Sequence, residues 1–122
     1  MFIPVDVWFR AFLLSTVVEA PIVALLLYRW EPSRPRLVAL VGFANLASHP
    51  AVWFVFSQLL DIGTPAYLLV VEGWAAACEA LFYGVAVRGL PVRWAIVISL
   101  VANTVSFLVG QLVFALWPGL GL

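Results

Sequence analysis

Four long apolar stretches constrain the fold of this chain more than any other feature. They cover residues 11–28, 37–60, 65–87 and 94–117. At about 1.5 Å of rise per helical residue, each stretch is long enough to cross a hydrocarbon core roughly 30 Å thick. Hydrophobic residues make up 66% of the chain and charged residues 10%, which lies outside the range of soluble globular domains. The sequence therefore predicts an all-α membrane protein with four transmembrane helices.

The short segments between the stretches carry residues that end and begin helices. Residues 31–36 contain two prolines, which lack the backbone donor that a helix needs. In the turn at 61–65, Thr64 is a predicted N-cap and Pro65 belongs to the first turn of the next helix. Such short connections place consecutive helices side by side. We expect one domain over residues 1–122, folded as an antiparallel four-helix bundle.

The two halves of the chain repeat one pattern. Glu19 is followed by an apolar helix, an arginine-bearing turn, a second apolar helix and then Asn45. Glu79 is followed by the same series, which ends at Asn103. Because each repeat contains two spans, both would enter the membrane in the same sense, related by an axis along the membrane normal. We therefore predict two parallel-repeat helical hairpins with pseudo-twofold symmetry. The repeats cover about residues 7–60 and 65–117.

The acids and amides of this pattern should form a polar core. Glu19, Asn45, Glu79 and Asn103 lie at similar depth near the middle of the predicted membrane. An ionisable side chain at that depth is costly, so these residues should point into the bundle and find partners there. Desolvation disfavours a charged carboxyl, and two close carboxyls resist joint ionisation. We expect Glu19 and Glu79 to be protonated at least in part at neutral pH.

A second polar tier lies further from the arginine-bearing turns. Glu72 precedes Glu79 by seven residues and His49 follows Asn45 by four, so each shares a helical face with the inner residue. Phenylalanines occupy the matching positions of the other half, at Phe12 and Phe107. The symmetry is therefore broken in this tier, which makes it the place where specificity is expected.

Prolines and possible metal ligands adjoin the core. Pro21 and Pro50 should kink their helices and free backbone carbonyls as candidate cation ligands. Carboxyl, imidazole and amide groups suit Mg, Mn, Zn or Fe, but the Glu-x-x-His pair of di-iron bundles is absent from the sequence. No cofactor is firmly implied. If a divalent metal binds, its ligands would be Glu19, His49, Glu72 and Glu79.

Several other classes of function are disfavoured. The formal net charge is zero, so there is no basic stripe for nucleic acid. The single cysteine, Cys78, excludes an intrachain disulfide. Nucleophile elbows, phosphate loops and His-Glu-x-x-His motifs are absent, which argues against an enzyme. The lipid bilayer is the expected partner, and a homo-oligomer or a larger membrane complex is compatible with a chain of this size.

The arginines predict the orientation. Basic residues in short loops stay on the cytoplasmic side. The loops near 31–36 and 88–93 should therefore be cytoplasmic and both termini outside, in a bacterial inner membrane. The arginines that support this are Arg29, Arg34, Arg36, Arg88 and Arg93, against Arg10 at the other end.

Two functions follow from the buried polar core. The first is the binding or relay of a small cation, as part of transport, and a proton is the favoured candidate. The alternative is a non-catalytic structural or accessory subunit of a larger membrane complex, in which the polar core serves only helix packing. The predicted ion- or proton-binding residues are Glu19, Asn45, His49, Glu72, Glu79, Asn103 and Ser106.

Overall fold

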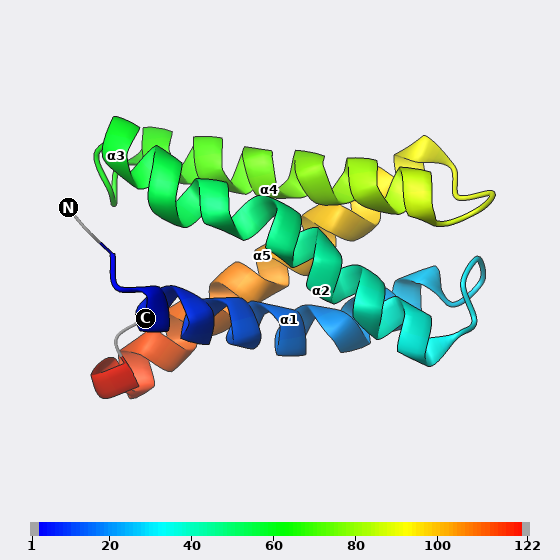
Figure 1. Ribbon diagram of the computed structural model, residues 1–122, viewed down its shortest axis with the longest axis horizontal. Helices are drawn as coiled ribbons and strands as arrows, with labels where there is room; N and C mark the ends of the chain where they lie inside the picture. The colour runs from blue at the N-terminus through cyan, green and yellow to red at the C-terminus, as the bar shows by residue number, and fades with distance from the viewer. Residues whose placement is uncertain (1–2, 121–122) are drawn as a thin grey trace.

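The computed structural model describes residues 3–120, which fold into long helices joined by short turns (Figure 1). Helix α1 spans Val5–Leu27 and α2 spans Arg34–Pro50. Helix α2 continues into a π-helix, η1, at Ala51–Phe56 and a short α3 at Ser57–Leu59. Helix α4 spans Pro65–Ala86, α5 spans Val92–Leu116, and a 3₁₀ turn, η2, covers Pro118–Leu120.

Residues 3–120 contain four helices long and apolar enough to cross a membrane: α1, the continuous helix from α2 to α3, α4 and α5. Their outward faces are strongly exposed, as at Leu25 (81%), Val85 (80%) and Leu69 (76%). In water such a surface would be unfavourable, whereas in lipid it is the surface that a spanning helix needs. The four predicted apolar helices are therefore present, and they indicate a small integral membrane protein.

The first helix begins earlier than the apolar stretch that predicts it. It starts at Val5 rather than at residue 11, so the mixed segment before that stretch is helical. Asp6 and Arg10 explain this, because their side chains form an ion pair of 2.9 Å one helical turn apart. An acid in the first turn also complements the helix dipole.

Thr64 caps α4 as the sequence predicts. Its Oγ1 accepts a hydrogen bond of 3.2 Å from the backbone N–H of Tyr67. Gly63, just before it, has a φ of 86°, a backbone conformation that favours glycine. The turn between α3 and α4 is thus built from local residues, and it fixes where Tyr67 enters the bundle.

The two prolines affect their helices differently. Pro50 ends α2 and the π-helix η1 follows directly, because proline offers no N–H for the regular backbone ladder. Pro21 stays inside α1, with its ring and the side chain of Val17 both on the outer surface. Both residues are exposed, so this part of α1 faces outward rather than toward the buried acids.

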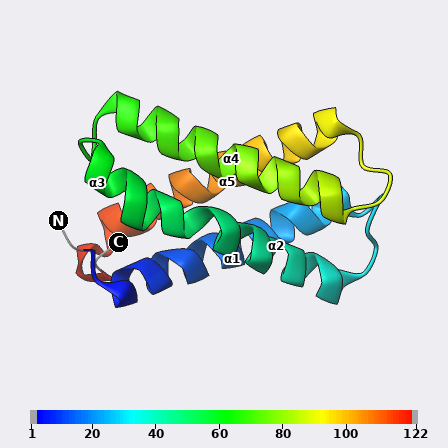
Figure 2. The same cartoon turned by 45° about the horizontal axis from the view of Figure 1, so that its top comes forward.

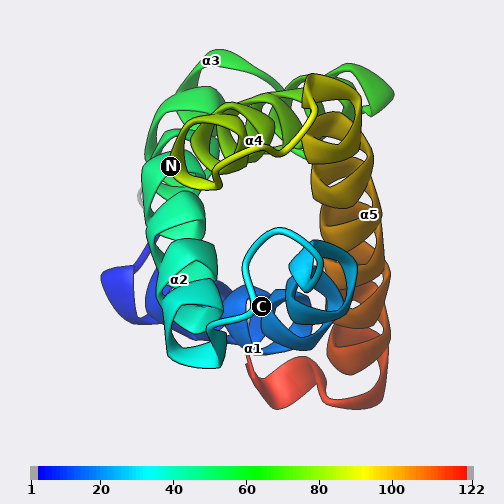
Figure 3. The same ribbon diagram turned by 90° about the vertical axis from the view of Figure 1, so that its right-hand side faces the viewer.

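The helices surround a common centre. Seen along the bundle, α1, α2, α4 and α5 form the four sides of a ring, with α1 opposite α4 and α2 opposite α5 (Figure 3). Each helix contacts two neighbours, in the order α1, α2, α4, α5 and back to α1. The chain reverses direction at every turn, so the turns after α1 and α4 lie at one end of the bundle (Figures 1 and 2).

The half of the bundle nearest those two turns is closely packed. Arg36 secures its end, because its Nη2 donates to the Ala86 carbonyl oxygen at 2.8 Å and its Nε pairs with Glu31 at 2.8 Å. Aliphatic side chains and one tyrosine fill the interior of this half. The buried residues are Val23, Leu27, Leu37, Leu40, Val41, Ala44, Tyr83, Val87, Leu90, Ala95, Ile98 and Ala102.

Candidate functional site

A layer of buried polar side chains crosses the middle of the bundle. Glu19 of α1 is 1% exposed, while Glu79 of α4 and Asn45 of α2 are fully buried. Asn103 of α5 is 9% exposed. Every long helix therefore contributes one acid or one amide to this layer, as expected if each polar side chain avoids lipid.

The first acid and amide are bonded to each other. Asn45 Nδ2 donates to Glu19 Oε2 at 3.0 Å, and the same nitrogen donates to the backbone carbonyl of Val41 at 3.2 Å. The second bond lies within α2, one helical turn back, so it fixes the rotamer of the amide. Asn45 is therefore held with its nitrogen toward the carboxyl of Glu19.

The second pair has the same geometry. Asn103 Nδ2 donates to Glu79 Oε2 and also to the backbone carbonyl of Ser99, at 2.9 Å, one turn back in α5. Ser99 in turn donates from its hydroxyl to the Ala76 carbonyl oxygen of α4 at 2.6 Å. Helices α4 and α5 are thus joined by two side-chain hydrogen bonds at this level.

A serine from the other half of the chain lies near each carboxyl. Ser106, one turn after Asn103, interacts with the carboxyl of Glu19. Ser48, one turn after Asn45, lies beside the carboxyl of Glu79. The two carboxyls are also close enough to interact electrostatically with each other. The two Asn–Glu pairs therefore lie close together at the centre of the bundle.

Three polar atoms of this region have no hydrogen-bond partner within residues 3–120. They are Asn45 Oδ1, Glu79 Oε1 and the hydroxyl oxygen of Tyr83. A buried polar atom without a partner costs about 1–3 kcal/mol. The layer therefore keeps hydrogen-bonding capacity that its own residues do not use.

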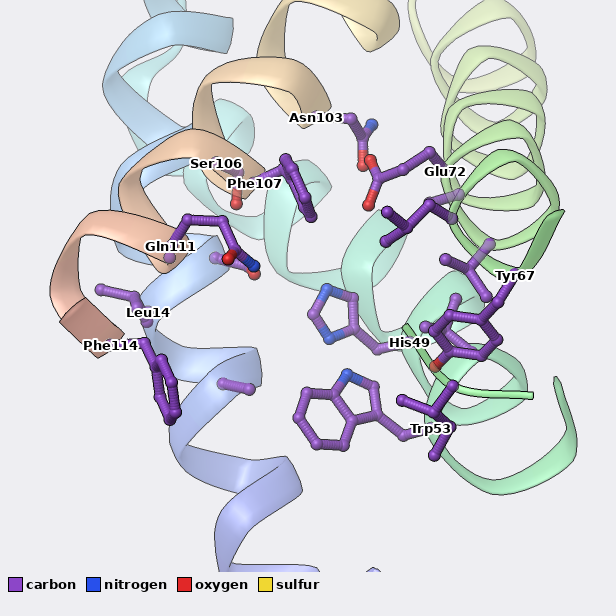
Figure 4. A pocket seen from close by; sticks show the side chains of 18 of the residues that line it. Leu14, His49, Trp53, Tyr67, Glu72, Asn103, Ser106, Phe107, Gln111 and Phe114 are labelled. Atoms are coloured by element: carbon purple, nitrogen blue, oxygen red, sulfur yellow. The ribbon is translucent and has the colours of Figure 1, made fainter. Parts of the chain in front are cut away.

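A cavity of about 400 Å³ opens on one side of the layer. It reaches from Glu19 toward Ile62 and Gly63 in the turn between α3 and α4. Figure 4 shows side chains from several helices surrounding it. The apolar core closes the opposite side of the layer, so the acids are open to a cavity at only one end of the bundle. The predicted residues that line it are Glu19, His49, Glu72, Asn103 and Ser106.

The other two predicted residues, Asn45 and Glu79, are buried and do not line the cavity. His49 and Glu72 both face it, but no hydrogen bond or ion pair joins them in the described part of the chain. His49 Nδ1 has no partner. Its ring packs edge-on against the ring of Phe12, and the two ring centroids are 6.0 Å apart. Phe12, which stands where the other half has Glu72, therefore contacts the histidine.

The residues do not fit a metal centre. Among residues 3–120 there is no group of three or more His, Cys, Asp or Glu side chains close enough to hold a metal ion. The set Glu19, His49, Glu72 and Glu79 is split by the geometry, because Glu79 lies outside the cavity that the others line. A divalent metal is therefore a prediction without structural support.

Aromatic residues of the site are not evident from the sequence. Trp53 and Tyr67 line the cavity together with Gln111 and Phe114 (Figure 4). Trp53 lies in the π-helix, and only the proline before it signals an irregular helix there. Tyr83 could have been found by spacing, because it follows Glu79 by one helical turn and so shares its face.

Comparisons with known proteins gave no match, whether to a protein-family model, to a curated protein or to a solved structure. The assignment of a function therefore depends on the geometry of the polar layer and the cavity.

Proposed function

We propose that this membrane protein binds or relays a small cation within the bilayer, with a proton as the first candidate. Glu19 and Glu79 would be the paired acids, and Asn45 and Asn103 would orient them. Glu72, nearer the mouth of the cavity, would exchange protons with the aqueous side. A cation at this site lowers the repulsion between neighbouring carboxyls, which is the physical reason for binding one.

One observation carries the proposal. The Glu19 carboxyl is 1% exposed and sits at mid-bundle, yet it lines a cavity that extends toward the end of the molecule. A carboxyl that served packing alone would not be expected to line a cavity of this size. Buried acids that meet a space large enough for water are the components of proton relays in membranes.

The proposal includes an origin in duplication and an orientation. The matched Asn–Glu bonds, each with a second bond to the carbonyl four residues back, support two related hairpins. The arginines near 31–36 and 88–93 lie at the turns after α1 and α4, which supports a cytoplasmic location for that end in a bacterial inner membrane. The cavity would then open to the outside.

Proton flux into liposomes tests the proposal. The purified protein is reconstituted with a pH-sensitive dye trapped inside, and a pH gradient is imposed while valinomycin and potassium hold the membrane potential. We expect the wild type to collapse the gradient faster than empty liposomes do. Glu19→Gln keeps the size and hydrogen bonding of the side chain but cannot carry a proton, so flux should fall to the empty-liposome rate.

Asp61→Asn is the matched control. Asp61 is an exposed acid in the turn at the same end of the bundle, so its replacement should leave the flux unchanged. Circular dichroism shows whether each variant is folded. Flux through Glu19→Gln equal to that of the wild type would contradict the relay.

The alternative, a non-catalytic accessory subunit, also has an observation in its favour. Each Asn–Glu bond joins the two helices of one hairpin, which is what helix packing alone would need. Interhelical bonds of this kind contribute about 0.6 kcal/mol on average, and up to about 1.7 kcal/mol, in membrane proteins. A wild-type protein with no flux above that of empty liposomes would favour this function.

A further inference from the structure

The cavity is much larger than a proton site requires. At about 30 Å³ per water molecule, its volume of about 400 Å³ has room for roughly a dozen waters. It falls within the range of small-molecule sites in proteins, which begins at about 300 Å³. The size of the space thus points to a ligand with several heavy atoms.

The walls of the cavity combine aromatic rings with acids. Trp53, Tyr67, Phe107 and Phe114 come from three different segments: the π-helix, α4 and α5. Figure 4 shows these rings spread around the space, with His49 beside Trp53. Aromatic faces carry negative electrostatic potential and attract cations as well as apolar groups.

The charge of the lining has one sign. Glu19 and Glu72 face the cavity, and none of the residues that line it is an arginine or a lysine. Both ion pairs of the described residues involve other acids, Asp6 and Glu31. In residues 3–120 Glu72 has no hydrogen bond or ion pair, although it is only partly exposed and reaches into the cavity from α4 (Figure 4). Ionised carboxyls in this lining would repel an anionic ligand, whereas a positively charged group could pair with Glu72.

We propose that the cavity binds an organic cation, an amine or quaternary ammonium with an apolar body. Its positive group would lie between the carboxyls of Glu19 and Glu72. Its apolar body would pack against Trp53, Phe107 and Phe114. The inference deepens the proposed function, because Glu19 is also the acid assigned to the proton. An incoming cation would displace a proton from the acid that it meets, so charge is conserved in the exchange.

Isothermal titration calorimetry of the full chain in detergent tests this inference. The probes are tetramethylammonium, benzyltrimethylammonium and benzyltributylammonium, which add apolar volume to one positive charge. Benzenesulfonate is the anionic control, and neopentylbenzene is the neutral carbon isostere of benzyltrimethylammonium. We expect the benzyl cations to bind more tightly than tetramethylammonium, and both controls to bind more weakly than benzyltrimethylammonium by about tenfold or more.

Glu72→Gln is the principal variant. The Glu72 side chain has no bond to lose, so the fold should survive while affinity for benzyltrimethylammonium falls about tenfold, equivalent to about 1.4 kcal/mol. Phe107→Leu should weaken the benzyl cations and spare tetramethylammonium. Asp61→Asn, in the exposed turn, is the control that should bind as the wild type does. If none of the three cations binds, or if Glu72→Gln binds as well as the wild type, the inference is wrong.

The same titrations separate this inference from the proposed function. Repeating them in buffers of different ionisation enthalpy counts the protons released on binding. Cation binding together with no proton flux in liposomes would support the organic-cation site and contradict the relay. Proton flux that depends on Glu19, in a protein that binds none of the three cations, would support the relay and overturn the organic-cation site.

Discussion

Replacing Asn103 by leucine tests the physical basis of the polar layer most directly. The side chain of Glu79 is fully buried, its Oε1 already has no partner, and its Oε2 accepts from Asn103. Asn103→Leu keeps the branching and the number of heavy atoms of the side chain, but the carboxyl of Glu79 loses the donor that the amide supplies. Leaving a buried polar group unsatisfied costs about 1–3 kcal/mol, so the variant should lose that much stability.

The reasoning also predicts a rescue. When both partners of a buried hydrogen bond are replaced by apolar groups of similar shape, the change can be nearly neutral. The double variant Asn103→Leu/Glu79→Leu should therefore recover most of the loss and unfold within about 1 kcal/mol of the wild type. Thr104→Leu, on the exposed side of the same helix, should have no measurable effect.

Reversible unfolding in mixed micelles, with a rising fraction of dodecyl sulfate, measures these differences. Far-ultraviolet circular dichroism follows the helices, and the tryptophan fluorescence of the protein follows tertiary packing. An Asn103→Leu protein as stable as the wild type would refute the reasoning, because Glu79 would then not depend on the amide. A double variant that is less stable than the single one would refute it as well.

Two further predictions concern hydrogen bonds outside the acid pairs. Ser99→Ala removes the bond to the Ala76 carbonyl between α5 and α4, so the same assay should show a loss of stability of about 0.5–1.5 kcal/mol. We expect this loss to be smaller than that of Asn103→Leu, because the carbonyl is a backbone helix acceptor. A larger loss than that of Asn103→Leu would argue against this ranking. Thr64→Ala removes the N-cap of α4 and should lower the stability by about 1 kcal/mol. Thr64→Ser keeps the capping hydroxyl and should be about as stable as the wild type. Equal stability of Thr64→Ala and the wild type would show that the cap contributes nothing.

The sequence predicts the polar layer well because lipid leaves few alternatives for such residues. Glu19 and Glu79 cannot face hydrocarbon without a large cost, so their depth alone indicates that they point inward. Their amide partners follow from the same argument. Apolar residues give no such signal: Trp53 lines the cavity and Trp74 is 40% exposed, although both lie in apolar helices. The aromatic residues of the site therefore could not be predicted from the sequence.

The irregular segment after Pro50 shows another limit of sequence reasoning. The proline predicts a disturbed helix, but from the sequence alone either a kink or a π-helix could accommodate the missing backbone hydrogen bond. Val52 and Trp53 of the π-helix line the cavity together with residues distant in the sequence, so their surroundings cannot be deduced from the local pattern. The start of α1 is a simpler case, because the Asp6–Arg10 pair could have been recognised from its spacing.

The serines near the two carboxyls have a consequence for a backbone broken between Ile62 and Gly63. Each fragment would hold a glutamate whose hydroxyl neighbour belongs to the other fragment, Ser106 for Glu19 and Ser48 for Glu79. Each fragment alone would keep its Asn–Glu bond but lose that neighbour, so we expect two such fragments, made separately, to associate. Such association would depend on the side chains at the centre of the bundle and not on the connecting peptide.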